Sequence, residues 1–255
     1  MLPEETVTVW DPEPLASAGR ADPLGPRDVH LWLLPLDIAP FPFEQVAAVL
    51  NREERDRASR FRSNQDRRRF EAARGLMRHV LGNYLGLPPA AVRFENGPQG
   101  KPSLAGPGGQ TRLEFNLSHS TAWALLGVTR GRAIGVDIEA VRRTLDLEDI
   151  ARRTFAPAEL DHVLRQPPGQ RTEGFFTCWT RKEAFVKAMG GGLSIGLKRF
   201  VVSIDPHVPA EIRSIDGSSQ AGAGWTLWGF RPLAGYCAAA AVHGKDLALR
   251  MKCLT

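Results

Sequence analysis

Three features of secreted and membrane proteins are missing from this sequence of 255 residues. No apolar run approaches the roughly 20 residues that a membrane-spanning helix needs. Glu4 and Glu5 stand where a secretory leader would be basic, and no apolar stretch follows them. The three cysteines, Cys178, Cys237 and Cys253, are odd in number and lack metal-ligand spacing. We therefore expect a cytoplasmic protein with reduced cysteines and no membrane contact.

Familiar catalytic motifs are missing as well. The loop that presents Lys101 lacks the G-x-x-x-x-G-K-[ST] spacing of a Walker loop. Five of the six histidines have no serine or cysteine in a recognisable nucleophile motif: His30, His79, His162, His207 and His243. No histidine–cysteine cluster suits zinc. These absences argue against nucleotide hydrolysis of the Walker type, nucleophile-and-base catalysis and zinc chemistry.

The net charge of +5 is concentrated in one segment. Residues 52–78 contain ten arginines and five acidic residues, an excess equal to that of the whole chain. Such a stripe indicates an anionic partner: nucleic acid, a polyphosphate ligand or an acidic protein surface. A solvated helix face with local ion pairs is the equally simple alternative.

The order of expected elements repeats along the chain. Residues 1–27 are rich in Pro, Ala, Asp and Glu and predict an extended or mobile arm. Residues 28–130 and residues 131–255 each predict a strand, then helices, then three strands. We therefore expect an α+β pseudo-dimer of two similar halves, each with a small, mainly antiparallel sheet packed by helices. A ligand site between such halves is a usual location.

Three segments of the sequence predict helices near the candidate functional residues. Residues 44–60 predict one helix. Ser63, with Asp66 three residues later, resembles a capping box, and the helix that it begins should end at Gly86. Apolar spacing predicts a third helix over residues 172–189.

Asp137 and Glu139 lie in a short segment that predicts a strand. Positions two apart in a strand project to the same face, so these carboxylates can point together while Ile134, Val136 and Ile138 face a core. Taken alone, an Asp-x-Glu pair is more often a solvated pair on an exposed strand.

Glu183 and Lys187 lie four residues apart on the expected helix 172–189 and share a face. The simple interpretation is a surface ion pair. If the helix instead brings Glu183 to Asp137 and Glu139, three carboxylates form a hard oxygen site for Mg²⁺ with positions left for phosphate and water. That geometry predicts a phosphate-handling enzyme.

Two further segments carry polar groups. Asn116–Ser120 is expected to end a strand in a polar turn that presents Ser118 and His119, although such turns often bond only their own backbone. The loop from residue 96 to residue 102 presents Lys101 and by itself predicts no more than a turn.

Taken together and in this order, four segments resemble the 4′-phosphopantetheinyl transferases of the Sfp-like class. The resemblance runs from about Arg52 to Leu193. The segments are Gly100-Lys101-Pro102, Phe115 to Ser120, Gly135 to Glu139, and Trp179 to Lys187 with Gly190 to Leu193. It implies a monomeric pseudo-dimer of two α+β halves with coenzyme A in the cleft.

The resemblance also implies the reaction. Phosphopantetheine moves from coenzyme A to a serine of an apo acyl or peptidyl carrier protein, and adenosine 3′,5′-bisphosphate is released. Asp137, Glu139 and Glu183 match the family's metal ligands for Mg²⁺, with Mn²⁺ as an alternative. Glu183 also matches the residue that deprotonates the carrier serine, directly or through a metal-bound water. Lys187 matches the lysine that stabilises or protonates the departing bisphosphate.

Further positions are implied to bind coenzyme A. Gly100, Lys101 and Pro102 match the family's loop, and Ser118 and His119 match positions that hold the nucleotide and its phosphates. Arg57 and Arg69 lie where the family supplies basic contacts to the 3′-phosphate. The arginine excess is therefore assigned to coenzyme A and an acidic carrier surface.

Two alternatives to a carrier-activating enzyme stay open from the sequence. One is a scaffold that binds coenzyme A or carriers without catalysis. The other is a nucleic-acid-binding protein that uses residues 52–78, although this segment lacks interleaved aromatics and any known reader motif. The resemblance implies that the protein has no nucleic-acid partner.

Overall fold

The computed structural model describes residues 10–18, 23–37, 42–97, 100–142, 146–191, 196–205 and 208–255. The chain divides into two compact units. The first unit is Trp10–Gly131 together with Ala248–Thr255, and the second is built on Arg132–Leu247. Each unit combines a sheet with packed helices, which confirms the α+β class expected from the sequence.

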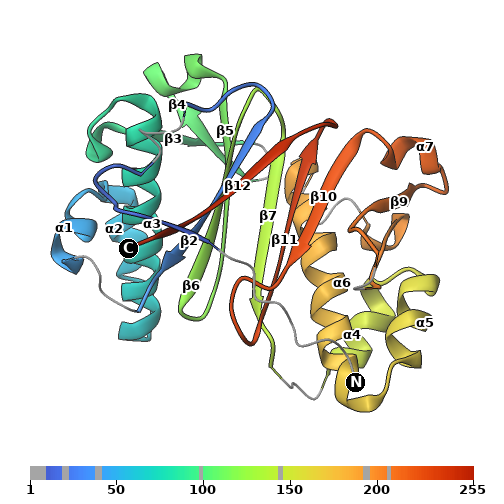
Figure 1. Ribbon diagram of the computed structural model, residues 1–255. Coiled ribbons are helices and arrows are strands. Elements are labelled where there is room, and N and C mark those ends of the chain that lie inside the picture. Colours follow the sequence, from blue (N-terminus) through green and yellow to red (C-terminus); the bar gives the residue numbers. More distant parts are fainter. Residues whose placement is uncertain are drawn as a thin grey trace. The chain divides into compact units, whose positions relative to one another are not determined.

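The first unit contains a five-stranded sheet with the order β1-β12-β2-β6-β5 (Figure 1). Its strands are β1 (Asp11–Glu13), β2 (Asp28–Pro35), β5 (Leu113–Ser120), β6 (Trp123–Arg130) and β12 (Ala248–Leu254). Strands β2, β6 and β5 are antiparallel neighbours, whereas β12 lies parallel to both β1 and β2. A short hairpin of β3 (Arg93–Asn96) and β4 (Pro102–Ala105) stands apart from this sheet.

Helices cover one face of the five-stranded sheet. They are α1 (Phe43–Ala48), α2 (Arg52–Ala58) and α3 (Asn64–Leu85), with 3-10 turns η1 (Pro89–Ala91) and η2 (Gly106–Thr111). The core of the unit joins the apolar face of α3 to Trp32, Phe115 and Leu126 of the sheet. Burial of these side chains is the main source of stability for such a layer.

The second unit contains a three-stranded antiparallel sheet with the order β10-β11-β7. Its strands are β7 (Ile134–Ala140), β10 (Trp225–Phe230) and β11 (Tyr236–His243), and a separate pair is formed by β8 (Phe200–Val202) and β9 (Ile212–Ile215). Its helices are α4 (Leu147–Thr154), α5 (Pro157–Arg165), α6 (Pro168–Met189) and α7 (Ser219–Gly222), with the turn η4 (Leu197–Arg199).

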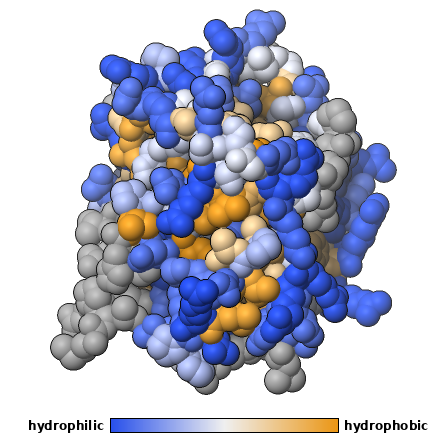
Figure 2. Space-filling view, turned by 90° about the vertical axis from the view of Figure 1, so that its right-hand side faces the viewer, coloured by the Kyte–Doolittle hydropathy of each residue, from blue (hydrophilic) through white to orange (hydrophobic). Residues whose placement is uncertain are grey.

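Helix α6 is the central element of the second unit. It lies against β7 and β11, and α4 and α5 pack against it (Figure 1). Phe175, Phe185 and Ala184 of α6 belong to the core of this unit, together with Phe200 of β8 and Ala239 of β11. The face seen in Figure 2 is mostly hydrophilic, with apolar patches between the hydrophilic side chains near its middle.

Three local expectations differ from the structure. The helix expected over residues 44–60 is two helices, because the side chain of Asn51 caps the amide of Glu54 and starts a new helix there. Within the expected arm, Asp11–Glu13 forms strand β1, which pairs with β12. Strand β12 joins the first unit and not the second, since it hydrogen-bonds to β2.

The expected ends of helix α3 are confirmed, and some other expectations concern residues outside the described ranges. Ser63 accepts a bond from the amide of Asp66, and Gly86 ends α3 in the left-handed conformation, as the sequence predicts. Residues 1–9 and 19–22 of the expected arm, and Gly192 and Leu193 of the glycine segment, lie outside the described residues.

Candidate active site

Asp137 and Glu139 lie on the same face of β7. Asp137 is opposite Ala239 and Glu139 is opposite Cys237 in the register with β11. Ala239 and Cys237 belong to the core beneath α6, so this face of the strand is turned toward that helix. Ile138, which alternates with them, is fully buried, as the strand pattern predicts.

Gly135 begins this face of β7 and lets α6 approach closely. A methyl group at Gly135 would collide with the carbonyl oxygen of Ala184 and the amide nitrogen of Ala188. Only a residue without a Cβ leaves room for the backbone of α6 at this point. The close approach brings the middle of α6 beside the carboxylates of β7.

Lys187 connects the helix to the strand. Its Nζ donates to Oδ1 of Asp137 at 2.6 Å, and Asp137 is 3% exposed. The ion pair therefore spans α6 and β7, and the charge of Lys187 also acts on Glu183. Glu183, one turn earlier on α6, is half-buried.

Several charged side chains act on the carboxyl group of Glu183. Burial is the largest cause that raises the pKa of its carboxyl group, and the negative charges of Asp137 and Glu139 raise this pKa further, while Lys187 lowers it. Three carboxylates and one ammonium group thus act on one another within the second unit. A half-buried glutamate with a raised pKa is a common feature of proton-transfer sites.

Ser118 and His119 lie inside strand β5, which continues to Ser120. The turn expected at these residues comes later, where Thr121 has a positive φ of 50°. Consecutive residues of a strand project to opposite faces, so the two side chains do not share one. Ser118 is buried, and His119 is exposed.

Lys101 follows a tight turn between β3 and β4. Gly100 takes a positive φ of 77°, and its amide donates to the carbonyl oxygen of Gly97. Pro102 is the first residue of β4. Burial lowers the pKa of Lys101, and the negative charge of Glu114 opposes this effect.

The two candidate arginines lie in different surroundings. Arg69 of α3 donates two bonds to the carboxylate of Asp37, at 2.8 Å and 2.5 Å. These bonds lower the pKa of Asp37. Arg57 of α2 is exposed and stands 5.4 Å from the ring centre of Phe70. Of the two, only Arg69 is bound to a carboxylate in this way.

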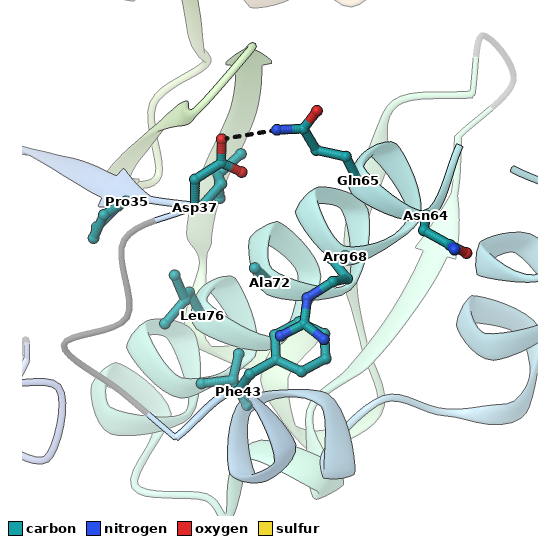
Figure 3. A pocket seen from close by; sticks show the side chains of 10 residues that line it. Pro35, Asp37, Phe43, Asn64, Gln65, Arg68, Ala72 and Leu76 are labelled. Atoms are coloured by element: carbon teal, nitrogen blue, oxygen red, sulfur yellow. Dashed lines mark hydrogen bonds between the residues drawn. The ribbon is translucent and has the colours of Figure 1, made fainter. Parts of the chain in front are cut away.

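A pocket of about 460 Å³ opens beside Asp37 (Figure 3). Its apolar floor includes Leu76 and Ala72 of α3, and Gln65 donates to Asp37 at 3.5 Å. Arg68 lies over the ring of Phe43, 3.9 Å from its centre. The pocket contains none of the residues that the sequence assigned to the site.

A buried cluster of arginines lies on the other side of α3. Glu54 binds Arg74 and Arg78 through charged bonds of 2.7 Å and 2.8 Å, and Arg78 also donates to the carbonyl oxygen of Val92. The positive charge of Arg57 acts on Arg74. One negative charge thus pairs with two positive charges, which leaves an excess of positive charge near Arg57.

Two family models match the chain. The model of the 4′-phosphopantetheinyl transferase superfamily matches residues 133–241, and that of a 4′-phosphopantetheinyl transferase N-terminal domain matches residues 39–130. The 4′-phosphopantetheinyl transferase HetI of Nostoc sp. is 40% identical over 217 residues, which cover 85% of this chain and 88% of the relative. The chain belongs to this superfamily. It is a transferase of the phosphopantetheinyl type.

Other known proteins are also similar. A 4′-phosphopantetheinyl transferase of Bacillus subtilis is 31% identical to this transferase, over 69% of the chain and 81% of the relative. Among solved structures, the holo-[acyl-carrier-protein] synthase of Thermotoga maritima is similar with a TM-score of 0.35 and 20% identity, over 45% of this chain and 64% of that one.

Sequence patterns missed several residues of the transferase that support these sites. Glu54 stands three residues after Asn51, which signals a helix cap, but nothing in the sequence links it to Arg74 and Arg78. Gly135 was visible as part of the Gly-Val-Asp-Ile-Glu segment, yet its role depends on how close α6 lies. The charge of Glu114 acts on Lys101 because the fold brings β4 and β5 into contact.

Two absences concern the described part of the transferase. No group of three or more histidine, cysteine, aspartate or glutamate side chains in the described ranges is arranged to hold a metal ion. No helix in those ranges is both long and apolar enough to cross a membrane.

Proposed function

We propose that this transferase moves 4′-phosphopantetheine from coenzyme A to a serine of an apo acyl or peptidyl carrier protein and releases adenosine 3′,5′-bisphosphate. The arrangement of Glu183, Lys187 and Asp137 on α6 and β7 is the observation that best supports the chemistry. We further propose that it acts as a cytoplasmic monomer and that the carrier has an acidic surface.

Glu183 is the proposed proton acceptor. Its raised pKa makes the carboxylate a stronger base than an ordinary glutamate. The serine hydroxyl loses its proton to Glu183 as the serine oxygen forms a bond to the phosphorus of the phosphopantetheine group. The bond from that phosphorus to the oxygen of the adenosine phosphate breaks, and its electron pair leaves with this oxygen.

Lys187 is proposed to stabilise the departing bisphosphate. Its ammonium group is held at Asp137, 2.6 Å from Oδ1, so its position is set before a substrate arrives. A preorganised positive charge stabilises negative charge that develops on a leaving oxygen, and the ammonium can also donate a proton to it.

Asp137, Glu139 and Glu183 are the proposed ligands of Mg²⁺, with Mn²⁺ as an alternative. The chemistry of the donor set suits the ion because carboxylate oxygens are the ligands that Mg²⁺ prefers. The three side chains are not arranged as a metal site here, where Lys187 binds Asp137, so they would have to draw together around the ion. The charges of Asp137 and Glu139 raise the pKa of Glu183, an excess of negative charge that a divalent cation offsets. When bound, the ion would neutralise charge on the pyrophosphate of coenzyme A.

Residues of the first unit are proposed to hold coenzyme A. Lys101, with the backbone of Gly100 and Pro102, is assigned to the nucleotide and its phosphates. Ser118 and His119 are assigned to separate parts of the nucleotide, because they project to opposite faces of β5. Arg57 is a better-supported contact to the 3′-phosphate than Arg69, which already binds Asp37.

The intact mass of an apo carrier protein tests the reaction. After incubation with coenzyme A, Mg²⁺ and the transferase, the carrier should gain the mass of phosphopantetheine. Glu183→Ala should slow this gain by about 10²–10⁴-fold. Glu148→Ala, which removes an exposed glutamate paired with Arg152 on α4, is the matched control and should keep the rate. A wild-type protein that binds coenzyme A and modifies no carrier would instead be a non-catalytic scaffold.

Dephospho-coenzyme A tests the assignment of the arginines. Since a charge-assisted bond contributes about 1.5–3 kcal/mol, Arg57→Ala should reduce the preference for coenzyme A over dephospho-coenzyme A by roughly 10–100-fold. Arg69→Ala should leave this preference unchanged. The reverse pattern in kcat/KM would assign the 3′-phosphate to Arg69.

A further inference from the structure

A fully buried ion pair lies next to Glu183 along α6. Lys182 is 0% exposed and Glu159 of α5 is 1% exposed. The Lys182 ammonium donates to both carboxylate oxygens of Glu159, at 2.7 Å and 2.6 Å, and to the carbonyl oxygen of Phe200 at 2.8 Å. The ammonium also lies 4.2 Å from the ring centre of Phe200. Neither charged group has a role in the proposed chemistry.

The same carboxylate binds two backbone amides. Glu159 accepts from the amide of Ala156 at 2.7 Å, which closes the first turn of α5. It also accepts from the amide of Val202 in β8 at 2.8 Å. The pair therefore ties three elements, α5, α6 and β8, at one point.

Stability alone does not account for a pair of this kind. Removing two charges from water is costly, and well-packed apolar side chains of similar volume often stabilise a protein as much or more. In some proteins a buried polar or charged group is kept because its directional bonds specify one arrangement of the elements that it joins. The three donor bonds of Lys182 join α6 to α5 and to β8.

Glu183 follows Lys182 directly on α6, so its direction depends on the rotation of α6 about its own axis. Successive residues of a helix point about 100° apart. Lys182 is held toward α5 and β8, and one turn beyond Glu183, Lys187 is bound to Asp137 of β7. Glu183 thus stands between two anchored lysines on the same helix.

We propose that the Lys182–Glu159 pair positions Glu183 for proton transfer by fixing the rotation of α6 and the position of α6 along its own axis. Neither member touches the substrate. The proposal rests on the role of Glu183 in the proposed function.

The test separates positioning from stability through kcat and KM. The variants are Lys182→Met, Glu159→Gln and the apolar double variant Glu159→Leu with Lys182→Met. The matched control is Lys252→Met in the first unit, where Lys252, 5% exposed, pairs with Glu13 at 3.2 Å. Carrier modification is measured below each melting temperature and scaled to the folded fraction from near-ultraviolet circular dichroism, and coenzyme A binding is measured by calorimetry.

Displacement of Glu183 should lower kcat. We expect kcat per folded molecule to fall by about 10- to 100-fold in Lys182→Met, and by less in Glu159→Gln, because a shift of about 1 Å at a catalytic group costs up to about 10²-fold. KM and affinity for coenzyme A should stay within about twofold of wild type. The double variant should regain melting temperature without regaining kcat, and Lys252→Met should lose melting temperature only.

Two results would overturn the positioning role. One is a wild-type kcat in the folded fraction of Lys182→Met or Glu159→Gln. The other is a kcat that returns together with the melting temperature in the double variant. If Lys182→Met does not fold, Glu159→Gln and the double variant decide the question. A wild-type protein that transfers nothing would refute the proposed function, which is a different outcome.

Discussion

At the scale of single residues, Glu183 has two opposite effects: the proposed chemistry needs its carboxylate, and ionisation of that carboxylate lowers stability. Its pKa is raised above the ordinary value of 4.5, so the folded state holds the proton more tightly than the unfolded state does. Stability therefore falls as the pH rises from 4.5 through the raised pKa. The ionised carboxylate is the destabilising form.

Glu183→Gln should raise the melting temperature of the metal-free protein at pH 7, and with Mg²⁺ present it should slow carrier modification by about 10²–10⁴-fold. The stability difference from wild type should shrink as the pH is lowered through the raised pKa and should vanish below 4.5, because only there is wild-type Glu183 protonated in both the folded and the unfolded state. Differential scanning calorimetry with a chelator present measures the melting temperature at each pH, and the carrier-modification assay measures the transfer rate. A lower melting temperature at pH 7 would contradict the raised pKa.

Glu54 shows the reverse behaviour. Burial acts to raise its pKa, but the charges of Arg74 and Arg78 and the cap bond to Asn51 outweigh it, so the pKa lies below 4.5. Its contribution to stability is present above 4.5 and is lost as the pH falls through the lowered pKa.

Glu54→Gln should lower the free energy of unfolding by about 3–5 kcal/mol at neutral pH, since it leaves buried Arg78 without its counter-charge. Urea unfolding at pH 7 and below pH 4 measures this loss, which should be smaller in acid. Glu53→Gln, the exposed neighbour on the same helix, is the control. An equal loss at both pH values would argue against the ion pair as its cause.

At the scale of elements, the contact between α6 and β7 depends on one glycine. Gly135→Ala should push α6 away from the strand, lowering the free energy of unfolding by about 1–3 kcal/mol and the transfer rate by up to about 10²-fold. Gly169→Ala, on the same helix with open space around its Cβ position, should change neither by much. Thermal melts and carrier-modification rates of the two variants provide the comparison.

Sequence patterns predicted the ends of a helix correctly where those ends depend on neighbouring residues. The cap at Ser63 and the stop at Gly86 were correct because caps depend on neighbouring residues only. The break between α1 and α2 at Asn51 was missed although Asn51 and Glu54 form a local cap signal, because the prediction treats the segment as one helical stretch. His119 was expected in a turn, yet pairing with β6 extends the strand to Ser120.

At the scale of the whole molecule, the last strand belongs to a unit that begins far earlier in the chain. Strand β12 lies between β1 and β2, and Leu254 is 1% exposed. A chain ending at Leu247 would leave one edge of β2 unpaired and expose the apolar face that Leu254 covers. The control is a chain that lacks only Thr255, which is exposed.

Hydrogen exchange should detect the loss of β12. The amides of β2 that bond to β12 should lose protection in the shortened chain, and the melting temperature of the first unit should fall. Protection of β2 that equals wild type would show that β12 is dispensable for the sheet.

The sequence by itself determined the family, the α+β class and the identity of the candidate residues, because these depend on the order and spacing of side chains. Only the tertiary structure showed that Lys187 binds Asp137, that Arg69 binds Asp37, and that Lys182 is buried against Glu159. Each of these contacts joins residues at least 23 positions apart. Partners that are distant in sequence are chosen by the packing of helices on sheets, which local spacing does not encode.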